Sequence, residues 1–128
     1  MMHLDVPECS LIGTNPADST YPGATRLLPA GGSCVNFVSF PYKGPCIDAG
    51  KPQPHMLEFA CTTFSLKKEE MLMVGDRLDS DVLMGNRFGV DTLLLLSGVT
   101  DVEMLNATES NLQPKYFTRS IADIVPIF

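Results

Sequence analysis

The sequence predicts an α/β fold in which a parallel β-sheet carries helices on both of its faces. Two short apolar runs, at residues 71–74 and 92–96, are each closed by a pair that contains glycine, as strands buried on both faces are. Between them, apolar side chains recur at helical spacing and end at Gly89, where a left-handed C-cap glycine belongs. Strands that alternate with helices in this way predict parallel pairing with right-handed crossovers.

The segments before residue 71 are less regular. Residues 9–14 form a short apolar run that is typical of a buried strand, whereas residues 15–32 are rich in Pro, Gly, Ser and Thr and predict a loop or linker. A short helix over 33–37, with Ser33 as its cap, is expected next, followed by a strand of three residues at 47–49. Apolar side chains at helical spacing predict an amphipathic helix over 54–64.

The end of the chain predicts three further short elements. Residues 101–105 form one or two helical turns, and residues 116–117 form a short edge strand. A final helix over 120–125 is expected to begin at Ser120, with Asp123 at its third position as in a capping box. The predicted order in the second part of the chain is therefore βαβαβα.

Composition and charge argue against a nucleic-acid-binding function. The 128 residues are 45% hydrophobic and 19% charged, which is ordinary for a single soluble domain. The net charge is -6, and the basic residues are scattered rather than clustered, so a nucleic-acid-binding surface is not expected. The one basic pair, Lys67 and Lys68, is followed at once by two glutamates, a pattern typical of a solvated helix start.

The four cysteines, Cys9, Cys34, Cys46 and Cys61, show neither CxxC spacing nor histidines at zinc-finger distances. We interpret them as reduced thiols. The chain start has no basic segment followed by an apolar one, and no apolar run approaches the roughly 18 residues that a membrane helix needs. A cytoplasmic protein without membrane contact is therefore expected.

Charged residues follow two of the predicted strands. Ligands of open parallel sheets gather beyond the carboxyl ends of the strands, so Asp76 is well placed to bind Mg²⁺ directly. Asp81, one helical turn later, can bind a metal-bound water or hold a neighbouring cationic group. The alternative is that Asp79 and Asp81 only complement the helix N-terminus, an effect of about 0.3–1 kcal/mol each.

Lys51 lies between Gly50 and Pro52 and is free to lean towards the sheet end, where its ammonium can neutralise a substrate phosphate. Taken alone, it is interpreted as a solvated loop lysine. Together with Asp76 at a neighbouring strand end, it predicts a shared phosphate and metal site.

Four spaced motifs extend this interpretation: GKP at 50–52, MVGDRLDSD at 73–81, LSGVT at 96–100 and SIAD at 120–123. In this order they resemble the third and fourth motifs and the C-terminus of haloacid dehalogenase (HAD) superfamily phosphatases. The resemblance is to the group that contains phosphoglycolate phosphatase, pyridoxal phosphatase and 4-nitrophenylphosphatase, and it runs from about residue 9 to the end.

The resemblance implies a Rossmann-like core with a large inserted cap. Residues 1–31 would be the C-terminal remnant of the cap and its linker, and residues 32–128 the C-terminal part of the core. The cap remnant includes Asn15, which would contact substrate where the cap closes over it. The implied activity is Mg²⁺-dependent hydrolysis of small phosphate monoesters through a phosphoaspartyl intermediate.

The resemblance also implies a role for each charged residue. Lys51 would be the phosphate-stabilising lysine, Asp76 a Mg²⁺ ligand and Asp81 the second acidic residue of its motif, with Lys51 and Asp81 as catalytic residues. Asp79 would be a variable position. Metal and lysine together neutralise charge on the transferring phosphoryl group.

The sequence departs from the family pattern in lacking the motif that carries the nucleophile. The nucleophile of these phosphatases lies in an Asp-x-Asp-Gly motif near the N-terminus, and the only Asp-x-Asp here, at 79–81, lacks the glycine. We therefore expect the nucleophile and the central first strand to be missing, and the chain alone to be inactive. An exposed sheet edge would then favour self-association or a homodimer.

Two other interpretations stay open. The chain can be a non-catalytic, truncated homologue that keeps a phosphate or Mg²⁺ site, or an interaction module. A phosphoacceptor receiver domain is disfavoured, because its lysine would follow the acidic cluster, whereas Lys51 precedes it. In the enzyme interpretation the partner is a small phosphorylated substrate.

Overall fold

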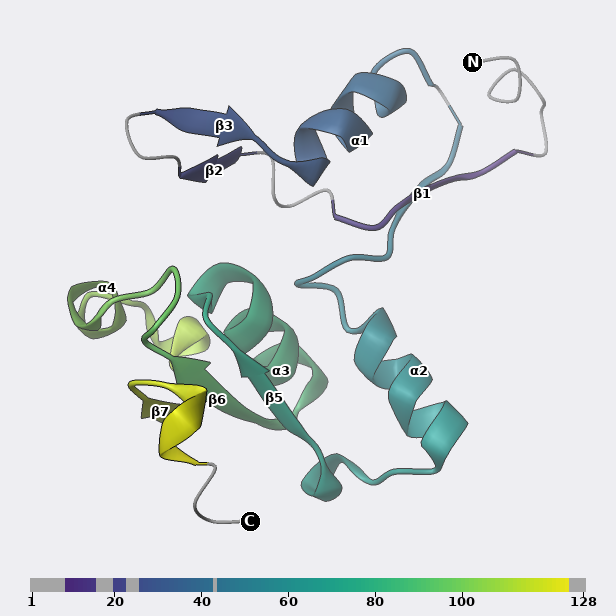
Figure 1. Cartoon of the computed structure of the whole chain (residues 1–128). Coiled ribbons are helices and arrows are strands. Elements are labelled where there is room, and N and C mark those ends of the chain that lie inside the picture. The colour runs from purple at the N-terminus through teal and green to yellow at the C-terminus, as the bar shows by residue number, and fades with distance from the viewer. Residues whose placement is uncertain (1–8, 16–19, 23–25, 43, 125–128) are drawn as a thin grey trace. The chain divides into compact units, whose positions relative to one another are not determined.

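The computed structural model describes residues 9–15, 20–22, 26–42 and 44–124. Its contacts divide the chain into two compact units, Met1–Gln53 and Pro54–Phe128 (Figure 1). Within the described residues, no helix is long and apolar enough to cross a membrane. Parallel strands alternate with helices in each unit, which confirms the predicted α/β class.

The first unit is built on a parallel pair of short strands. β1 (Leu11–Gly13) pairs with β4 (Cys46–Asp48), so that Ile12 lies opposite Ile47. The nine-residue helix α1 (Gly31–Ser39) lies between the two strands in the sequence and contacts β1. These elements confirm the strands that the sequence predicts at both places.

Two details of the first unit were predicted wrongly. The segment 15–32 contains an antiparallel pair, β2 (Thr20–Pro22) with β3 (Leu27–Pro29), where a loop or linker was expected. α1 begins at Gly31 after Ala30, so Ser33 lies inside the helix and is not its cap. The strands of this pair are three residues long and end in proline, so they lack the alternation by which strands are recognised in a sequence.

The second unit contains a three-stranded parallel sheet in the order β5–β6–β7 (Figure 1). Its strands are β5 (Leu72–Gly75), β6 (Asp91–Leu95) and β7 (Tyr116–Thr118). In register, Val74 lies opposite Leu93 and Leu94 lies opposite Phe117. The two apolar runs are therefore neighbouring parallel strands, and residues 116–117 form the edge strand, both as predicted.

The helices of the second unit follow the predicted positions. α2 (His55–Phe64) precedes β5, and α3 (Leu83–Phe88) connects β5 to β6 after a π-helical turn at Leu78–Val82. Gly89 ends α3 in the left-handed conformation, with φ of 84°. The C-cap glycine was therefore predicted correctly, whereas the π-helical turn was not foreseen.

The last elements are short and capped by side chains. α4 (Val102–Asn106) begins where the Asp101 carboxylate accepts the Met104 N–H at 2.8 Å. The final helix is a single 3₁₀ turn (Ile121–Asp123) with the predicted capping box of Ser120 and Asp123. Residue 125, to which a longer helix was expected to extend, lies outside the described residues.

The capping carboxylate of Asp123 is held in its charged form. Thr118 Oγ1 donates to Asp123 Oδ2 at 2.7 Å, and the Ser120 N–H donates to the same oxygen at 3.0 Å. These bonds, that of Thr118 foremost, lower the pKa of Asp123, because they favour the carboxylate over the protonated acid.

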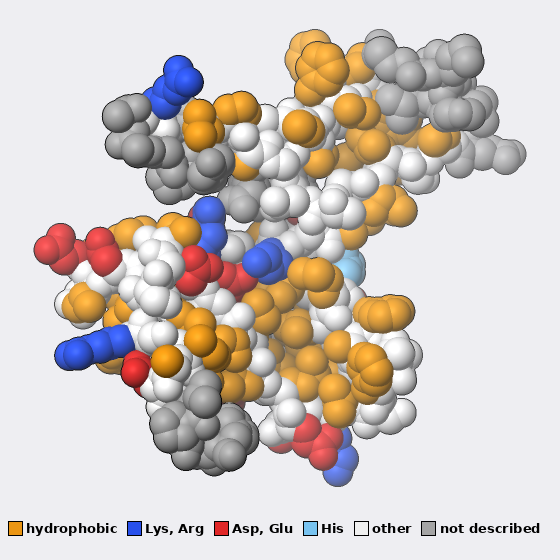
Figure 2. Space-filling view, in the orientation of Figure 1, with side chains coloured by type: hydrophobic (Ala, Val, Ile, Leu, Met, Phe, Trp, Pro, Cys, Tyr) orange, Lys and Arg blue, Asp and Glu red, His pale blue; other side chains and the backbone are white. Residues whose placement is uncertain are grey.

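The core of the second unit is formed by side chains from β6, the π-helical turn and α4. It is a cluster of four buried side chains, Leu78, Val82, Leu94 and Leu105. Leu94, on the central strand β6, is completely buried. The other strands are more exposed, and Figure 2 shows hydrophobic side chains gathered over α2 and β5. On β5, Leu72 and Val74 are 49% and 37% exposed.

Candidate functional site

Asp76 directly follows β5 and is held by the turn that follows β6. Its Oδ2 accepts a hydrogen bond from the Val99 N–H at 2.9 Å. Its backbone carbonyl accepts a second bond, from the Thr100 N–H, at 3.1 Å. The carboxyl ends of two neighbouring parallel strands therefore fix Asp76 where ligands of such sheets bind.

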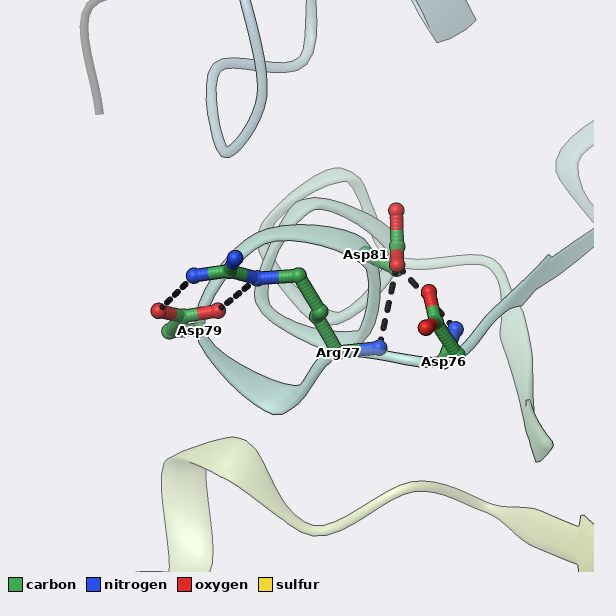
Figure 3. A network of polar contacts seen from close by, with 4 residues as sticks. All are labelled: Asp76, Arg77, Asp79 and Asp81. Carbon is green, nitrogen blue, oxygen red and sulfur yellow. Dashed lines mark hydrogen bonds and ion pairs between the residues drawn. The ribbon is translucent and has the colours of Figure 1, made fainter. Parts of the chain in front are cut away.

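Asp81 is buried, with 3% exposure, and faces the same strand end. Its Oδ2 accepts the backbone N–H groups of Asp76 at 3.2 Å and Arg77 at 3.1 Å (Figure 3). A Cβ at Gly75 would lie closer than 3.0 Å to the Asp81 side chain, so only glycine leaves room for this carboxylate. Asp81 therefore holds the backbone that carries Asp76.

The π-helical turn explains how Asp81 reaches back to β5. The N–H groups of Asp81 and Val82 both donate to the Arg77 carbonyl, at 3.2 and 3.1 Å. The second of these bonds spans five residues and widens the first turn by one residue. In the structure, this wider turn directs Asp81 towards the amides at the end of the strand.

Arg77 and Asp79 form an ion pair on the other side of this loop. Arg77 Nε donates to Asp79 Oδ1 at 3.0 Å and Arg77 Nη2 to Asp79 Oδ2 at 2.8 Å (Figure 3). The Asp79 side chain is 65% exposed. Exposed pairs of this kind add little stability, so Asp79 differs sharply from the buried Asp81.

Lys51 lies in a tight turn of the first unit. The Asp48 Oδ1 accepts the Gly50 N–H at 3.1 Å, and Gln53 Nε2 donates to Asp48 Oδ2 at 3.3 Å. A Cβ at Gly50 would lie closer than 3.0 Å to the carbonyl of Thr14, at the end of β1. Gly50 thus lets the turn of Lys51 pack against the end of the neighbouring strand.

Asn15 lies at the same end of the first unit. Its backbone nitrogen is 3.0 Å from the ideal Cβ position at Gly50, and its side-chain Nδ2 is 3.3 Å from that at Gly31. Asn15 and the turn of Lys51 are therefore neighbours, at the ends of two parallel strands. The structure brings together Lys51 with Asn15 in one unit and Asp76 with Asp81 in the other.

The carboxylates of the second unit can be compared with the ligands that a divalent cation needs. Among the described residues, no group of three or more His, Cys, Asp or Glu side chains is arranged to hold a metal. Mg²⁺ in phosphate-transferring sites commonly uses only one or two carboxylates and completes its shell with water and phosphate. Asp76 fits such a shell as one protein ligand, while the buried Asp81 serves the backbone behind it.

Three supporting residues were not predicted from the sequence. Asp48 closes the turn before Lys51, and its Asp-x-Gly spacing is a recognisable signal for such a turn. Val99 holds the Asp76 carboxylate and Gly98 leaves room for it, but the donor is a backbone N–H, which leaves no side-chain signature. Their place after a predicted strand and within the motif at 96–100 pointed to this turn, but not to its contact with Asp76.

Comparison with known proteins places the chain in a family. The HAD-hydrolase-like family matches residues 48–124. The chain is 38% identical over 120 residues to phosphoglycolate phosphatase 1A, chloroplastic, of Arabidopsis thaliana, a match that covers 93% of this chain and 33% of the relative. The chain thus spans about a third of that relative's length.

Solved structures agree with this match. A single-mutant thermostable NPPase from Geobacillus stearothermophilus superposes with a TM-score of 0.71 at 34% identity, over 91% of this chain and 44% of that one. A glycerol phosphate phosphatase from Mycobacterium tuberculosis in complex with magnesium gives a TM-score of 0.67 at 31% identity, over 80% and 31%. These relatives are phosphatases, and the chain belongs to the HAD-hydrolase-like family.

Proposed function

We propose that this chain supplies the phosphate-neutralising and metal-holding part of a Mg²⁺-dependent phosphatase for small phosphate monoesters, of the phosphoglycolate or 4-nitrophenyl phosphate type. The observation that supports it most is Asp76, whose carboxylate is fixed at the end of a parallel strand by the next strand's turn. The family of the chain and the metal-bound neighbour support the choice of reaction and of a divalent cation.

In this proposal each charged residue has one task. Asp76 would hold Mg²⁺, which when bound neutralises charge on the phosphoryl oxygens. Lys51 would place its ammonium against the same phosphate, and Asn15 would donate to a substrate oxygen. Asp81 would act as the second acidic residue by keeping Asp76 in place.

The nucleophile would come from residues outside this sequence, which contains no Asp-x-Asp-Gly. A carboxylate oxygen would form a bond to phosphorus while the ester P–O bond breaks and its electron pair leaves with the alkoxide or phenolate oxygen. Water would then cleave the phosphoaspartyl bond and release inorganic phosphate. The chain described here would contribute charge neutralisation and orientation to both steps.

The domain assignment is part of the same proposal. Residues 1–31 would belong to the cap and residues 32–128 to the core of the full-length fold. The structure itself shows a compact first unit through Gln53, with α1 beginning at Gly31. A cytoplasmic location likewise stays a prediction.

An alternative is a non-catalytic homologue that keeps a phosphate or Mg²⁺ site or serves as an interaction module. The observation that favours it is that, among the described residues, no group of three or more His, Cys, Asp or Glu side chains is arranged to hold a metal. The two functions differ in one measurable respect, which is whether the chain supports catalysis once a nucleophile is supplied.

We expect no turnover of 4-nitrophenyl phosphate by this chain with Mg²⁺. Fused behind the N-terminal portion of the Geobacillus NPPase, it should support turnover, which Asp76→Ala or Lys51→Met lowers by about 10²–10³-fold because transition-state charge is left unneutralised. Asp79→Ala, a matched change at the exposed aspartate, should leave the rate within about twofold of the unmodified fusion.

The outcomes separate the two functions. A folded fusion without turnover favours the non-catalytic homologue. Turnover by the chain alone that is lost in Asp76→Ala would contradict an external nucleophile. Removal of Mg²⁺ with a chelator should abolish any turnover, and persistence of the rate would contradict the role of the metal.

Self-association through the edge of β5 is also part of the proposal. Among the described strands only β6 pairs with β5, so its other edge presents unpaired backbone groups beside the exposed Leu72 and Val74. Sedimentation velocity at increasing concentration should show association, which Val74→Lys reduces. Val102→Lys, at a position 55% exposed on α4, should not reduce it. Equal effects of both variants would exclude the strand edge.

A further inference from the structure

The turn at residues 97–100 makes contacts with Asp76 that neither motif spacing nor the family match assigns. Two consecutive backbone N–H groups of this turn donate hydrogen bonds to Asp76. The Val99 N–H donates to the carboxylate Oδ2, and the Thr100 N–H donates to the backbone carbonyl. Thr100 is buried, with 1% exposure, so the turn is anchored in the second unit. Side chain and backbone of Asp76 are thereby held from the same side.

The hydrogen bond of Val99 distinguishes the two oxygens of the carboxylate. Oδ2 is occupied by the amide, whereas Oδ1 accepts no hydrogen bond from the described residues. Rotation of the carboxylate would break the bond to Val99. The turn therefore selects which oxygen of Asp76 is available to a ligand.

Gly98 leaves the space that the Asp76 side chain occupies next to the turn. An added Cβ would lie closer than 3.0 Å to the Oδ2, Cβ and Cγ atoms of Asp76. The backbone of Gly98 is not in the left-handed region, which among the described glycines only Gly89 occupies. Alanine at 98 would therefore act through its contact with Asp76 rather than through backbone strain.

We propose that Gly98 and Val99 are positioning residues that hold Asp76 in the one orientation in which Oδ1 can bind a divalent cation. This rests on the proposed function, because it assigns Asp76 to the metal. Outer groups that orient a ligand typically change metal affinity by 10–100-fold when they are lost. The turn after β6 is thus part of the metal site although it contributes no ligand.

The test uses the 128-residue chain and Mn²⁺ as the probe. Paramagnetic broadening of the amide signals around Asp76 is followed during a titration with Mn²⁺. Gly98→Ala should weaken Mn²⁺ binding about tenfold or more. An affinity unchanged from that of the unmodified chain would overturn the positioning role.

Gly85→Ala is the matched control. A Cβ at Gly85 would press on the Thr92 side chain, again closer than 3.0 Å, but between α3 and β6 and away from Asp76. It should disturb packing in the same unit while Mn²⁺ affinity stays within about twofold. Equal loss of affinity in both variants would show that Gly98→Ala acts through general destabilisation.

A second measurement does not depend on metal. Solvent exchange of the Val99 amide should be slow in the unmodified chain and at least about tenfold faster in Asp76→Ala, because its acceptor is a side chain. The Thr100 amide, bound to the backbone of the same residue, should keep its protection.

The two measurements separate the two proposals. An unchanged Val99 exchange rate in Asp76→Ala would overturn the role of the turn. The expected exchange rates without broadening by Mn²⁺ would instead contradict the metal role of Asp76, and with it the proposed function.

Discussion

Replacing Asp81 with alanine is expected to lower the free energy of unfolding of the chain by about 2–4 kcal/mol. The change leaves the part-buried N–H groups of Asp76 and Arg77 without their acceptor, and each should cost an amount near the lower end of the about 1–3 kcal/mol of a buried unsatisfied donor. A loss of this size is a large fraction of the stability of a small domain. Urea unfolding followed by circular dichroism measures it directly.

Two matched variants make the result specific. Asp81→Asn keeps a carbonyl oxygen of the same shape, so it should cost less than alanine. Asp79→Ala removes an aspartate two residues away, whose side chain is 65% exposed and paired with Arg77, and should change stability by under about 1 kcal/mol. Equal losses for Asp81→Ala and Asp79→Ala would show that the buried network is not stabilising.

Asp81→Ala also tests whether the residue that stabilises the end of β5 contributes to metal binding by Asp76. If Asp81 acts through the backbone of Asp76, then Asp81→Ala should also weaken Mn²⁺ binding. Full Mn²⁺ affinity in a folded Asp81→Ala chain would assign Asp81 to folding alone.

Much of the second unit could be predicted because its signals are local. The apolar runs of β5 and β6, the C-cap at Gly89 and the capping box of Ser120 and Asp123 each follow from a few neighbouring residues. Strands of only three residues that end in proline show no alternation of apolar and polar side chains, and the β2–β3 pair was missed for this reason although its partners are close in the sequence.

In the candidate site, too, features with a local sequence signal were predicted and features without one were missed. Asp76 was placed correctly at the end of a strand, because the strand and the residue are adjacent in the sequence. The orientation of Asp81 was not foreseen, since it depends on a π-helical turn whose extra residue has no signature in composition or periodicity. The bond from Val99 joins residues 23 positions apart and uses a backbone donor, so only a structure reveals it.

Leu94→Ala is expected to destabilise the chain by about 2–5 kcal/mol, which is the usual cost of a cavity at a fully buried leucine. Leu94 lies on the central strand and packs with Leu78, Val82 and Leu105, so its removal leaves a cavity that the surrounding side chains fill only in part. Leu72→Ala, on β5 with 49% exposure, should cost under about 1.5 kcal/mol. The midpoints of urea unfolding compare the two.

The destabilisation caused by Leu94→Ala should also loosen the turn that binds Asp76, because that turn directly follows β6, the strand that contains Leu94. In Leu94→Ala, the amides of Val99 and Thr100 should exchange faster together with those of β6, as parts of one cooperative unit. In Leu72→Ala they should keep their protection. Faster exchange confined to β6, with Val99 and Thr100 unchanged, would show that the turn is held by its own contacts and not by the core beneath it.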